Sequence, residues 1–234
     1  MSTLTHSRAL KAAFAHTIPV LTGFLVLGMA YGVLMQSKGY GPLWSVCMSA
    51  VAFCGSMQFV AITLLTTAFD PIQAFLLSLM VNARHLFYGI SMLQTYKGLG
   101  KIRGFLVYTL CDETFSIASS VQPPEGVDRG KFYGFISLLN YCYWVLGSLL
   151  GGLVGGLVTF NTKGLDFVLT ALFVVLFLEQ MRTKENCIFG CIGLGCTLLC
   201  AVAVRLYFPG ANLVIPAMLL ILAVLLLGRN KLCR

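Results

Sequence analysis

Residues 79–89 read LMVNARHLFYG and place an arginine and a histidine in the middle of an apolar run from about Pro71 to Gln94. Arg84 is 13 residues from the start of this run and 10 from its end. If the run crosses a bilayer, neither Arg84 nor His85 can easily reach water. A charge in mid-bilayer costs on the order of 3 kcal/mol on insertion scales, and such residues usually face a protein interior and serve a function. We therefore expect the fold to form around Arg84.

A second stretch carries the opposite charge. Residues 109–115 read TLCDETF, so that Asp112 and Glu113 lie between apolar flanks. Either carboxylate could form an ion pair with Arg84 that fixes two helices together. Such a pair does not exclude a role in function.

The composition excludes a soluble globular protein. The chain has 234 residues, of which 58% are hydrophobic and 10% are charged, and its mean hydropathy is +0.88. Soluble domains are about 25% charged, because their surface faces water. We therefore expect a single integral membrane domain over residues 1–234, of the all-α polytopic class, with about seven to eight transmembrane helices.

The net charge of +8 does not indicate nucleic-acid binding. The basic residues occur singly or in small groups at the ends of apolar runs, which is typical of residues that anchor membrane proteins on their cytoplasmic side. If every span crosses, nine lysines and arginines lie on the side of the N-terminus and six on the other, which favours a cytoplasmic N-terminus. The first apolar run has no convincing cleavage site after it, so we expect a retained helix rather than a signal peptide.

Eight apolar spans are expected, at about residues 17–36, 43–68, 71–94, 104–120, 132–159, 165–181, 187–207 and 212–228. The range 43–68 is longer than a bilayer core of about 30 Å requires. Gly55 and Ser56 lie in its middle, which predicts a tilted or interrupted helix. The range 104–120 is at the lower limit for crossing. One of these two ranges is therefore expected not to cross fully.

A weak internal similarity predicts two related halves, 17–94 and 132–207. In each half an apolar run ends on a glutamine and precedes a span that bears an arginine, Arg84 or Arg205. Repeats of this kind are common in transporters.

Small residues recur every four positions in the span 132–159, as Gly147, Gly151 and Gly155 and again as Ser148, Gly152 and Gly156. Two faces of small residues predict close contact with two neighbouring helices. These neighbours can belong to this chain or to a partner protein, and packing within the chain is the simpler interpretation.

The nine cysteines are not expected to form disulfides, because they lie in apolar runs and their number is odd. Cys187, Cys191, Cys196 and Cys200 resemble a metal cluster at first sight. At about 100° per residue, however, the first pair and the second pair lie on opposite faces of a helix. We interpret them as packing residues and expect neither a metal nor a cofactor.

The charged residues favour proton coupling. One arginine and two carboxylates leave one carboxyl without a fixed positive partner, and buried groups that exchange protons are what a proton-coupled transporter needs. Asp112 and Glu113 are the first candidates for this coupling site. His85 is a further candidate, since histidine titrates near neutral pH.

The same residues suit a small amphoteric solute such as an amino acid. Its carboxylate needs a cation or a helix N-terminus, which Arg84 or an interrupted helix at Gly55 could provide. Its ammonium needs an acidic partner, which Asp112 or Glu113 could provide. The apolar neighbours favour an aliphatic side chain. The candidate substrate-binding residues are Gly55, Ser56, Gln58, Asn82, Arg84 and Tyr88.

Three blocks of sequence, FCGSMQF at 53–59, NARHLFYG at 82–89 and CDETF at 111–115, resemble signature blocks of the AzlC family. The resemblance covers nearly the whole chain, and the second half matches mainly in hydropathy. It implies a bacterial inner-membrane protein that exports valine, leucine and isoleucine, with methionine and toxic analogues as further candidates. It also implies a separate small membrane partner of the AzlD type.

Three other classes are weaker alternatives. An intramembrane serine hydrolase would use Ser56 as nucleophile and His85 as base, but such residues in membrane helices more often form interhelical hydrogen bonds, and no oxyanion loop is evident. An ion channel would need rings of charge or a carbonyl filter. A non-transporting assembly subunit is the third alternative. We therefore expect a transporter and not an enzyme.

Overall fold

In a computed structural model, the described residues are 2–67, 70–157, 184–207 and 213–232, with isolated positions at 171, 174, 177, 178 and 181. These residues form helices and their connections, and they include no strand, so the all-α prediction is confirmed. The chain divides into two compact units, Met1–Thr162 and Lys163–Arg234, which are described separately. The span expected at 165–181 lies mostly outside the described residues.

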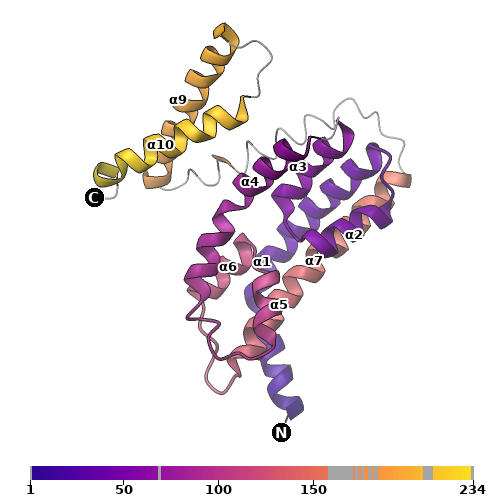
Figure 1. Cartoon of the computed structure of the whole chain (residues 1–234). Helices are drawn as coiled ribbons and strands as arrows, with labels where there is room; N and C mark the ends of the chain where they lie inside the picture. The colour runs from indigo at the N-terminus through magenta and orange to yellow at the C-terminus, as the bar shows by residue number, and fades with distance from the viewer. Residues whose placement is uncertain are drawn as a thin grey trace. The chain divides into compact units, whose positions relative to one another are not determined.

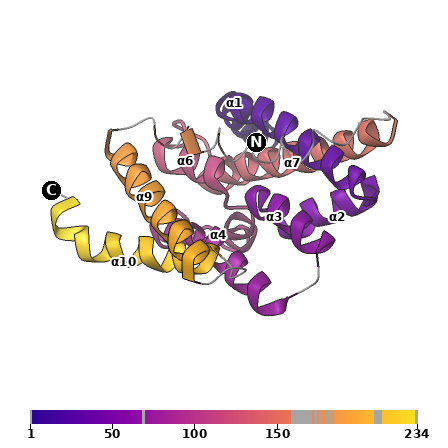
Figure 2. The same ribbon diagram turned by 90° about the horizontal axis from the view of Figure 1, so that it is seen from above.

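Helices α1 (Ser2–Ser37) and α7 (Arg129–Leu157) are the two longest and lie side by side in the first unit (Figures 1 and 2). The ring of His16 meets the ring of Phe132 edge-on, with centroids 6.1 Å apart. A Cβ at Gly28 would lie 3.0 Å from the Cα of Gly147. The first contact lies earlier in both helices and the second lies further along both. α1 and α7 therefore run in the same direction.

Both faces of small residues on α7 are used inside the chain. A Cβ at Gly147 would lie 2.8 Å from the carbonyl oxygen of Phe24 in α1, and a Cβ at Gly152 would lie 2.8 Å from the Cα of Pro42. Small residues allow such close approach of backbones, which is a main source of helix association in membranes. The expected contact with two neighbours is confirmed, and both neighbours belong to this chain.

Gly151→Ala is expected to lower the thermal unfolding midpoint, because its new Cβ would collide with the backbone of Met29 in α1. Over-packing of this kind costs about 1–3 kcal/mol. Gly23→Ala is the matched control, since nothing lies within 4 Å of a Cβ built there. Thermal unfolding of the purified variants in detergent checks the prediction. Equal midpoints for the two variants would contradict the packing of α1 against α7.

Helices α2 (Pro42–Ala52) and α3 (Gly55–Thr66) form a helical hairpin, here called hairpin one. The first residue of α2 packs on Gly152, near the end of α7. The last turn of α2 reaches Tyr141, whose hydroxyl donates to the carbonyl of Ala50 at 2.9 Å. Since Tyr141 lies near the middle of α7, α2 enters the unit only to about half its depth.

The chain reverses at Phe53, whose φ of 38° is left-handed and ends α2. α3 then returns along α1. The ring of Phe59 meets the ring of Tyr31 with centroids 5.7 Å apart, and the Tyr40 hydroxyl donates to the carbonyl of Leu65 at 3.2 Å. Tyr40 follows the end of α1, so hairpin one enters and leaves at the end of the unit where α1 finishes.

Helix α4 (Pro71–Met92) runs through the unit in the direction opposite to α1. Asp70 begins it, because its carboxylate accepts the backbone N–H of Ile72 at 2.9 Å, and proline is favoured at the first helical position. The last residue of α4 lies in a buried apolar cluster with Ala13 and Phe132. α4 therefore finishes where α1 and α7 begin.

Helices α5 (Ile102–Tyr108) and α6 (Asp112–Ser120) form a second helical hairpin, called hairpin two. The first side chain of α5 lies over Gly134, near the beginning of α7. After α6, the Tyr133 hydroxyl donates to the carbonyl of Val121 at 3.3 Å. Hairpin two therefore enters and leaves at the end where α1 and α7 begin.

The two hairpins enter the first unit from opposite ends (Figure 1). Their tips meet in the middle of the unit, where Tyr108 contacts Val51. The interruption expected in the range 43–68 is confirmed. The interpretation of 43–68 and 104–120 as single spans is wrong, because each range breaks in its middle and turns back. Their half-helices have 11, 12, 7 and 9 residues. At 1.5 Å per residue none can cross a core of about 30 Å.

Three helices in the described residues are long and apolar enough to cross a membrane, by length and composition: His6–Ser37, Arg129–Leu157 and Cys187–Tyr207. α4 has 22 residues, about 33 Å at 1.5 Å per residue, so it is long enough as well. Asn82, Arg84 and His85 lower its hydropathy. The first unit therefore consists of three long helices, α1, α4 and α7, and two hairpins.

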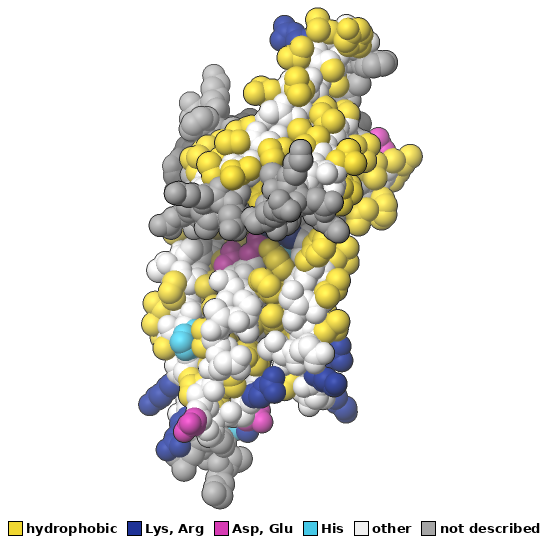
Figure 3. Space-filling model, turned by 90° about the vertical axis from the view of Figure 1, so that its left-hand side faces the viewer, with side chains coloured by type: hydrophobic (Ala, Val, Ile, Leu, Met, Phe, Trp, Pro, Cys, Tyr) yellow, Lys and Arg dark blue, Asp and Glu magenta, His cyan; other side chains and the backbone are white. Residues whose placement is uncertain are grey.

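Basic residues gather at one end of the first unit, where dark-blue side chains are seen at the lower end of Figure 3. Seven of the nine lysines and arginines in residues 2–157 belong to this end: Arg8, Lys11, Lys97, Lys101, Arg103, Arg129 and Lys131. Arg129 donates to the carbonyl of Thr95 at 3.0 Å, which fixes the 93–101 connection there. From the sequence, the 93–101 connection was expected at the end opposite the N-terminus. This expectation is wrong, because residues 43–66 turn back as hairpin one and do not cross the unit.

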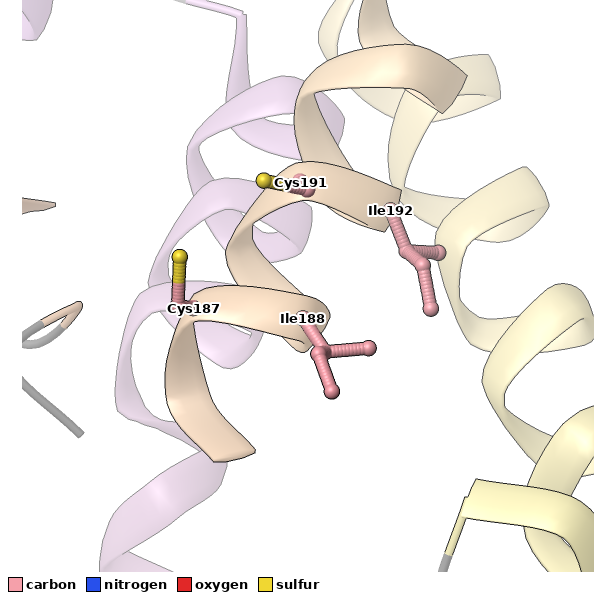
Figure 4. A pocket seen from close by; sticks show the side chains of 4 residues that line it. All are labelled: Cys187, Ile188, Cys191 and Ile192. Atoms are coloured by element: carbon pink, nitrogen blue, oxygen red, sulfur yellow. The ribbon is translucent and has the colours of Figure 1, made fainter. Parts of the chain in front are cut away.

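In the second unit, α9 (Lys184–Tyr207) packs against α10 (Val214–Leu232). Cys196 and Cys200 are buried. The other cysteine pair of α9 lines a hollow of about 590 Å³ together with two isoleucines (Figure 4): Cys187, Ile188, Cys191 and Ile192. This separation agrees with the helical spacing of the two pairs. No group of three or more metal-binding side chains exists among the described residues.

Candidate functional site

The two hairpin tips are connected by Arg84, near the middle of α4. Its Nη1 atom lies 2.8 Å from Oδ2 of Asp112, the first residue of α6. Its Nη2 atom donates to Oγ of Ser56, in the first turn of α3, at 2.9 Å. One guanidinium therefore joins three elements. The side chains of Arg84 and Asp112 are 32% and 37% exposed, so the pair is open to the surface of the unit.

Two helix N-termini lie at this ion pair. The first N–H groups of a helix have no partner within it and carry partial positive charge. The residues that precede α3 and α6, Cys54 and Cys111, provide no side-chain cap. Asp112 and Glu113 occupy the first turn of α6, where carboxylates stabilise a helix. The two N-termini and Arg84 can therefore hold an anionic group between them. In this structure that group is the carboxylate of Asp112.

An aromatic stack forms the second contact between α4 and α6. The rings of Tyr88 and Phe115 lie nearly parallel, with centroids 4.3 Å apart. The ring of His85 meets Tyr88 edge-on at 5.7 Å. Offset and edge-to-face pairs of this kind stabilise by about 0.5–1.5 kcal/mol beyond the area that they bury. They fix the turn of α4 that carries Arg84.

A groove of about 430 Å³ lies on another face of α4, between the hairpin tips. Asn82 and His85 line it, and the Cys54 thiol donates to Oδ1 of Asn82 at 2.8 Å. Nδ1 of His85 is buried and has no hydrogen-bond partner among the described residues. Arg84 does not line the groove, and helical spacing places it on the other side of α4. The sequence-predicted residues are therefore divided between two faces.

Gln58 and Gly55 lie in the packing of hairpin one against α7. The indole N–H of Trp144 donates to Oε1 of Gln58 at 2.7 Å, and Nε2 of Gln58 donates to Ser49 at 2.9 Å. Ser49 in turn lies 2.6 Å from the Ser148 hydroxyl. A Cβ at Gly55 would meet the Trp144 ring at 3.0 Å. These contacts favour a structural role for both residues, and their contact with a substrate stays a prediction.

The remaining candidates are placed as follows. Ser56, Arg84, Tyr88 and Asp112 come together on one side of α4. Glu113 follows Asp112 in α6 and forms no ion pair within the part of the chain that the structure describes. The Ser56 hydroxyl is bonded to Arg84 and not to His85. The described contacts therefore do not assemble the Ser–His pair that a hydrolase would need.

Tyr108 and Trp144 were not expected at the site. Tyr108, at the end of α5, donates to the carbonyl of Val51 at 2.8 Å and also to that of Ala50. Trp144 holds Gln58. The available signal in the sequence is weak. Both are aromatic residues with a polar atom inside apolar spans, and the buried one, Trp144, is of the kind that usually finds a hydrogen-bond partner.

Long apolar helices together with two broken helices that meet at an ion pair define a multi-pass membrane protein with the half-helix architecture that many secondary transporters use to hold substrates and ions. The chain belongs to the AzlC family, since the family model described as "AzlC protein" matches residues 19–158. The matched region contains both hairpins, Arg84 and Asp112.

Named relatives agree with this assignment. The chain is 49% identical to the branched-chain amino acid transport protein AzlC of Bacillus subtilis, over 96% of this chain and 87% of the relative. It is 39% identical to an uncharacterized membrane protein of Helicobacter pylori strain 26695, over 97% and 98%. It is 26% identical to the inner membrane protein YgaZ of Escherichia coli, over 73% and 72%. No solved structure matches the chain significantly.

Proposed function

We propose that this protein transports branched-chain amino acids across the bacterial cytoplasmic membrane, in the direction of export. The name of the Bacillus relative supports the substrate class. The observation that carries the proposal is the ion pair of Arg84 in α4 with Asp112 at the N-terminus of the half-helix α6. Valine, leucine and isoleucine are the proposed substrates, and methionine is a further one.

A zwitterion carries one negative and one positive group, which match the two members of this ion pair. The substrate carboxylate takes the place of Asp112 on the guanidinium of Arg84, where the N-terminus of α3 adds N–H donors. The substrate ammonium then pairs with the released Asp112. Arg84 and Asp112 each have a partner of opposite charge both before and after the substrate binds. Binding therefore avoids the cost of an unpaired charge inside the membrane.

Glu113 is the proposed proton carrier. Arg84 is paired with Asp112 at 2.8 Å, which leaves Glu113 as the carboxyl of the two that forms no ion pair among the described residues. Such a group can take up and release a proton as the site changes its exposure to the two sides of the membrane. Asp112 and His85 are the alternatives that the same site offers.

The distribution of basic residues supports an N-terminus in the cytoplasm. The end where α1 begins has seven lysines and arginines, and the opposite end of the first unit has Lys38. Short basic connections of this kind remain on the cytoplasmic side. With this orientation, hairpin two enters from the cytoplasm and hairpin one from the outside.

A small membrane subunit of the AzlD type is the proposed partner. The two faces of small residues on α7 are occupied by α1 and α2, so the partner is expected to contact other surfaces. The exposed apolar side of α4, which includes Phe75, Phe87 and Ile90, is available to lipid or to such a subunit.

Counterflow of labelled valine tests the proposal. Proteoliposomes with the purified chain and its small partner are loaded with unlabelled valine, whose efflux drives the uptake of labelled valine from outside. This uptake is expected to be about tenfold or more above that of protein-free liposomes, roughly the smallest difference that counts as carrier-mediated exchange. Leucine and isoleucine should compete, and lysine should not. If folded protein gives no counterflow with or without the partner, the chain is not the transporter, and the assembly-subunit alternative is favoured.

A further inference from the structure

The same chain order, a hairpin and then a long helix, occurs twice in the first unit. Residues 42–92 contain hairpin one and α4, and residues 102–157 contain hairpin two and α7. The two segments run in opposite directions through the unit. Each long helix has an asparagine near its middle that is followed by a glycine at the same spacing, in 82–89 and 140–147. The two segments therefore have the form of inverted repeats.

Hydrogen bonds at the tips agree with this correspondence. A cysteine precedes the second half-helix of each hairpin, and each tip is bonded to the asparagine of the following long helix. In hairpin one, Cys54 donates to Asn82 at 2.8 Å. In hairpin two, Asn140 donates to Thr114 at 3.0 Å, and Thr114 lies 3.1 Å from the thiol of Cys111. Each tip is thus held by its own long helix.

The end of α2 needs hydrogen bonds from outside. The last carbonyls of a helix have no partner within it, and in apolar surroundings an unpaired carbonyl costs free energy. Tyr141 of α7 donates to the carbonyl of Ala50 at 2.9 Å. The Tyr108 hydroxyl of hairpin two lies within hydrogen-bond distance of the carbonyls of Ala50 and Val51, 2.8 Å from the latter, and its single hydrogen is shared between them. One cap therefore comes from the body of the unit, and the other from the opposite hairpin.

We propose that the two hairpins are the two gates of the transport path and that the Tyr108 hydroxyl is the latch between their tips. This inference rests on the proposed transport function. While Tyr108 caps the carbonyls of Ala50 and Val51, both gates are held together and the path is closed at both ends. Release of the latch allows one hairpin to move without the other. Tyr108 acts in this proposal as a positioning residue, through the two carbonyls that it contacts.

The latch complements Arg84, which is the other connection between the tips through Ser56 and Asp112. When a substrate binds Arg84 and separates it from Asp112, Tyr108 still connects the two tips through the hydrogen bonds described above. Substrate binding therefore removes one contact between the hairpins while the Tyr108 contact keeps both from opening at once. Alternating access requires that the two gates are never open together. A transporter without the latch would open both gates together more often.

Two matched variants, Tyr108→Phe and Tyr141→Phe, test the latch. Both remove a hydroxyl that donates to Ala50, but only Tyr108 belongs to the opposite hairpin. Hydrogen–deuterium exchange is measured for the full-length protein in lipid nanodiscs. Removing one such hydrogen bond should raise exchange about three- to tenfold. In Tyr108→Phe the increase is expected at both tips, 49–56 and 108–114, and in Tyr141→Phe at 49–56 alone.

A second measurement gives an independent readout. Proteoliposomes with Tyr108→Phe are expected to dissipate an imposed pH gradient faster than wild type without substrate, whereas those with Tyr141→Phe are not. The proposal is overturned if the two variants show the same exchange pattern and the same leak. Failure of wild-type valine counterflow would instead reject the proposed function, and the exchange result could still be interpreted. Unchanged exchange in α1 confirms that both variants are folded.

Discussion

Arg84→Lys is expected to lower valine counterflow about tenfold or more, although it keeps the positive charge. The guanidinium of Arg84 places one nitrogen 2.8 Å from Asp112 and another 2.9 Å from Ser56. A lysine ammonium is a point charge without this planar fork and cannot replace it in a two-pronged contact. The variant therefore loses the connection between the hairpin tips and the geometry of carboxylate binding. Counterflow in proteoliposomes measures the loss.

Two control variants show whether the effect is specific to Arg84 and how much of it comes from the contact with Ser56. Arg103→Lys, at the basic end of the unit, is expected to leave counterflow unchanged. Ser56→Ala removes one of the two contacts of Arg84 and is expected to lower counterflow only a few-fold, in line with about 1 kcal/mol for one hydrogen bond. Wild-type counterflow in Arg84→Lys would contradict the account of the site. Transport retained in Ser56→Ala would exclude the hydrolase alternative, which needs the Ser56 hydroxyl as its nucleophile.

The second large effect concerns the two adjacent carboxyls. Glu113→Gln is expected to keep valine counterflow but to lose the stimulation of transport by a pH gradient, because it removes the proposed proton carrier and leaves the ion pair intact. Asp112→Asn is expected to lose both activities, since Arg84 is then left without its partner. Breaking a buried ion pair costs about 3–5 kcal/mol, and the partial exposure of this pair places the cost below that range.

Uptake of labelled valine with and without an imposed pH gradient distinguishes these outcomes. Glu125→Gln, in the loop after hairpin two, is the matched control and is expected to behave like wild type. If Glu113→Gln and Asp112→Asn both respond fully to the gradient, neither carboxyl couples transport to protons. A response lost only in His85→Ala would transfer this role to His85.

Much of the fold could be predicted from the sequence. The ranges 71–94, 132–159 and 187–207 agree closely with α4, α7 and α9, because proline, loops and charged residues mark their ends. The hairpins could not be predicted as hairpins. An apolar run has the same composition whether it crosses a membrane or turns back. In hairpin one, the residue with left-handed backbone is Phe53, whereas glycine usually marks such a position.

The site was predictable in its parts and not in its assembly. A pair between Arg84 and an acid was expected, but Asp112 and Glu113 are adjacent, and only the position of α6 selects Asp112. Gln58 was expected near a substrate, yet its amide is bonded to Trp144 and Ser49, contacts between segments far apart in sequence. Tyr108 contacts Val51 for the same reason. Such contacts depend on the opposite directions of the two hairpins.

The repeat halves 17–94 and 132–207 stay a prediction, because the second half includes residues outside the described ranges. The similarity within the described part relates 42–92 to 102–157 instead. A comparison of apolar runs could not find this similarity. The two segments share the cysteine and asparagine residues that hold their tips, more than a pattern of hydropathy.

Binding of labelled valine to the purified protein tests the central claim most directly, with isobutylamine as a competitor that lacks the carboxylate. Wild type is expected to bind valine at least tenfold more tightly than isobutylamine, a difference of about 1.4 kcal/mol, because Arg84 holds the carboxylate. Arg84→Ala is expected to bind both equally weakly. Wild-type affinity for valine in Arg84→Ala would contradict the account.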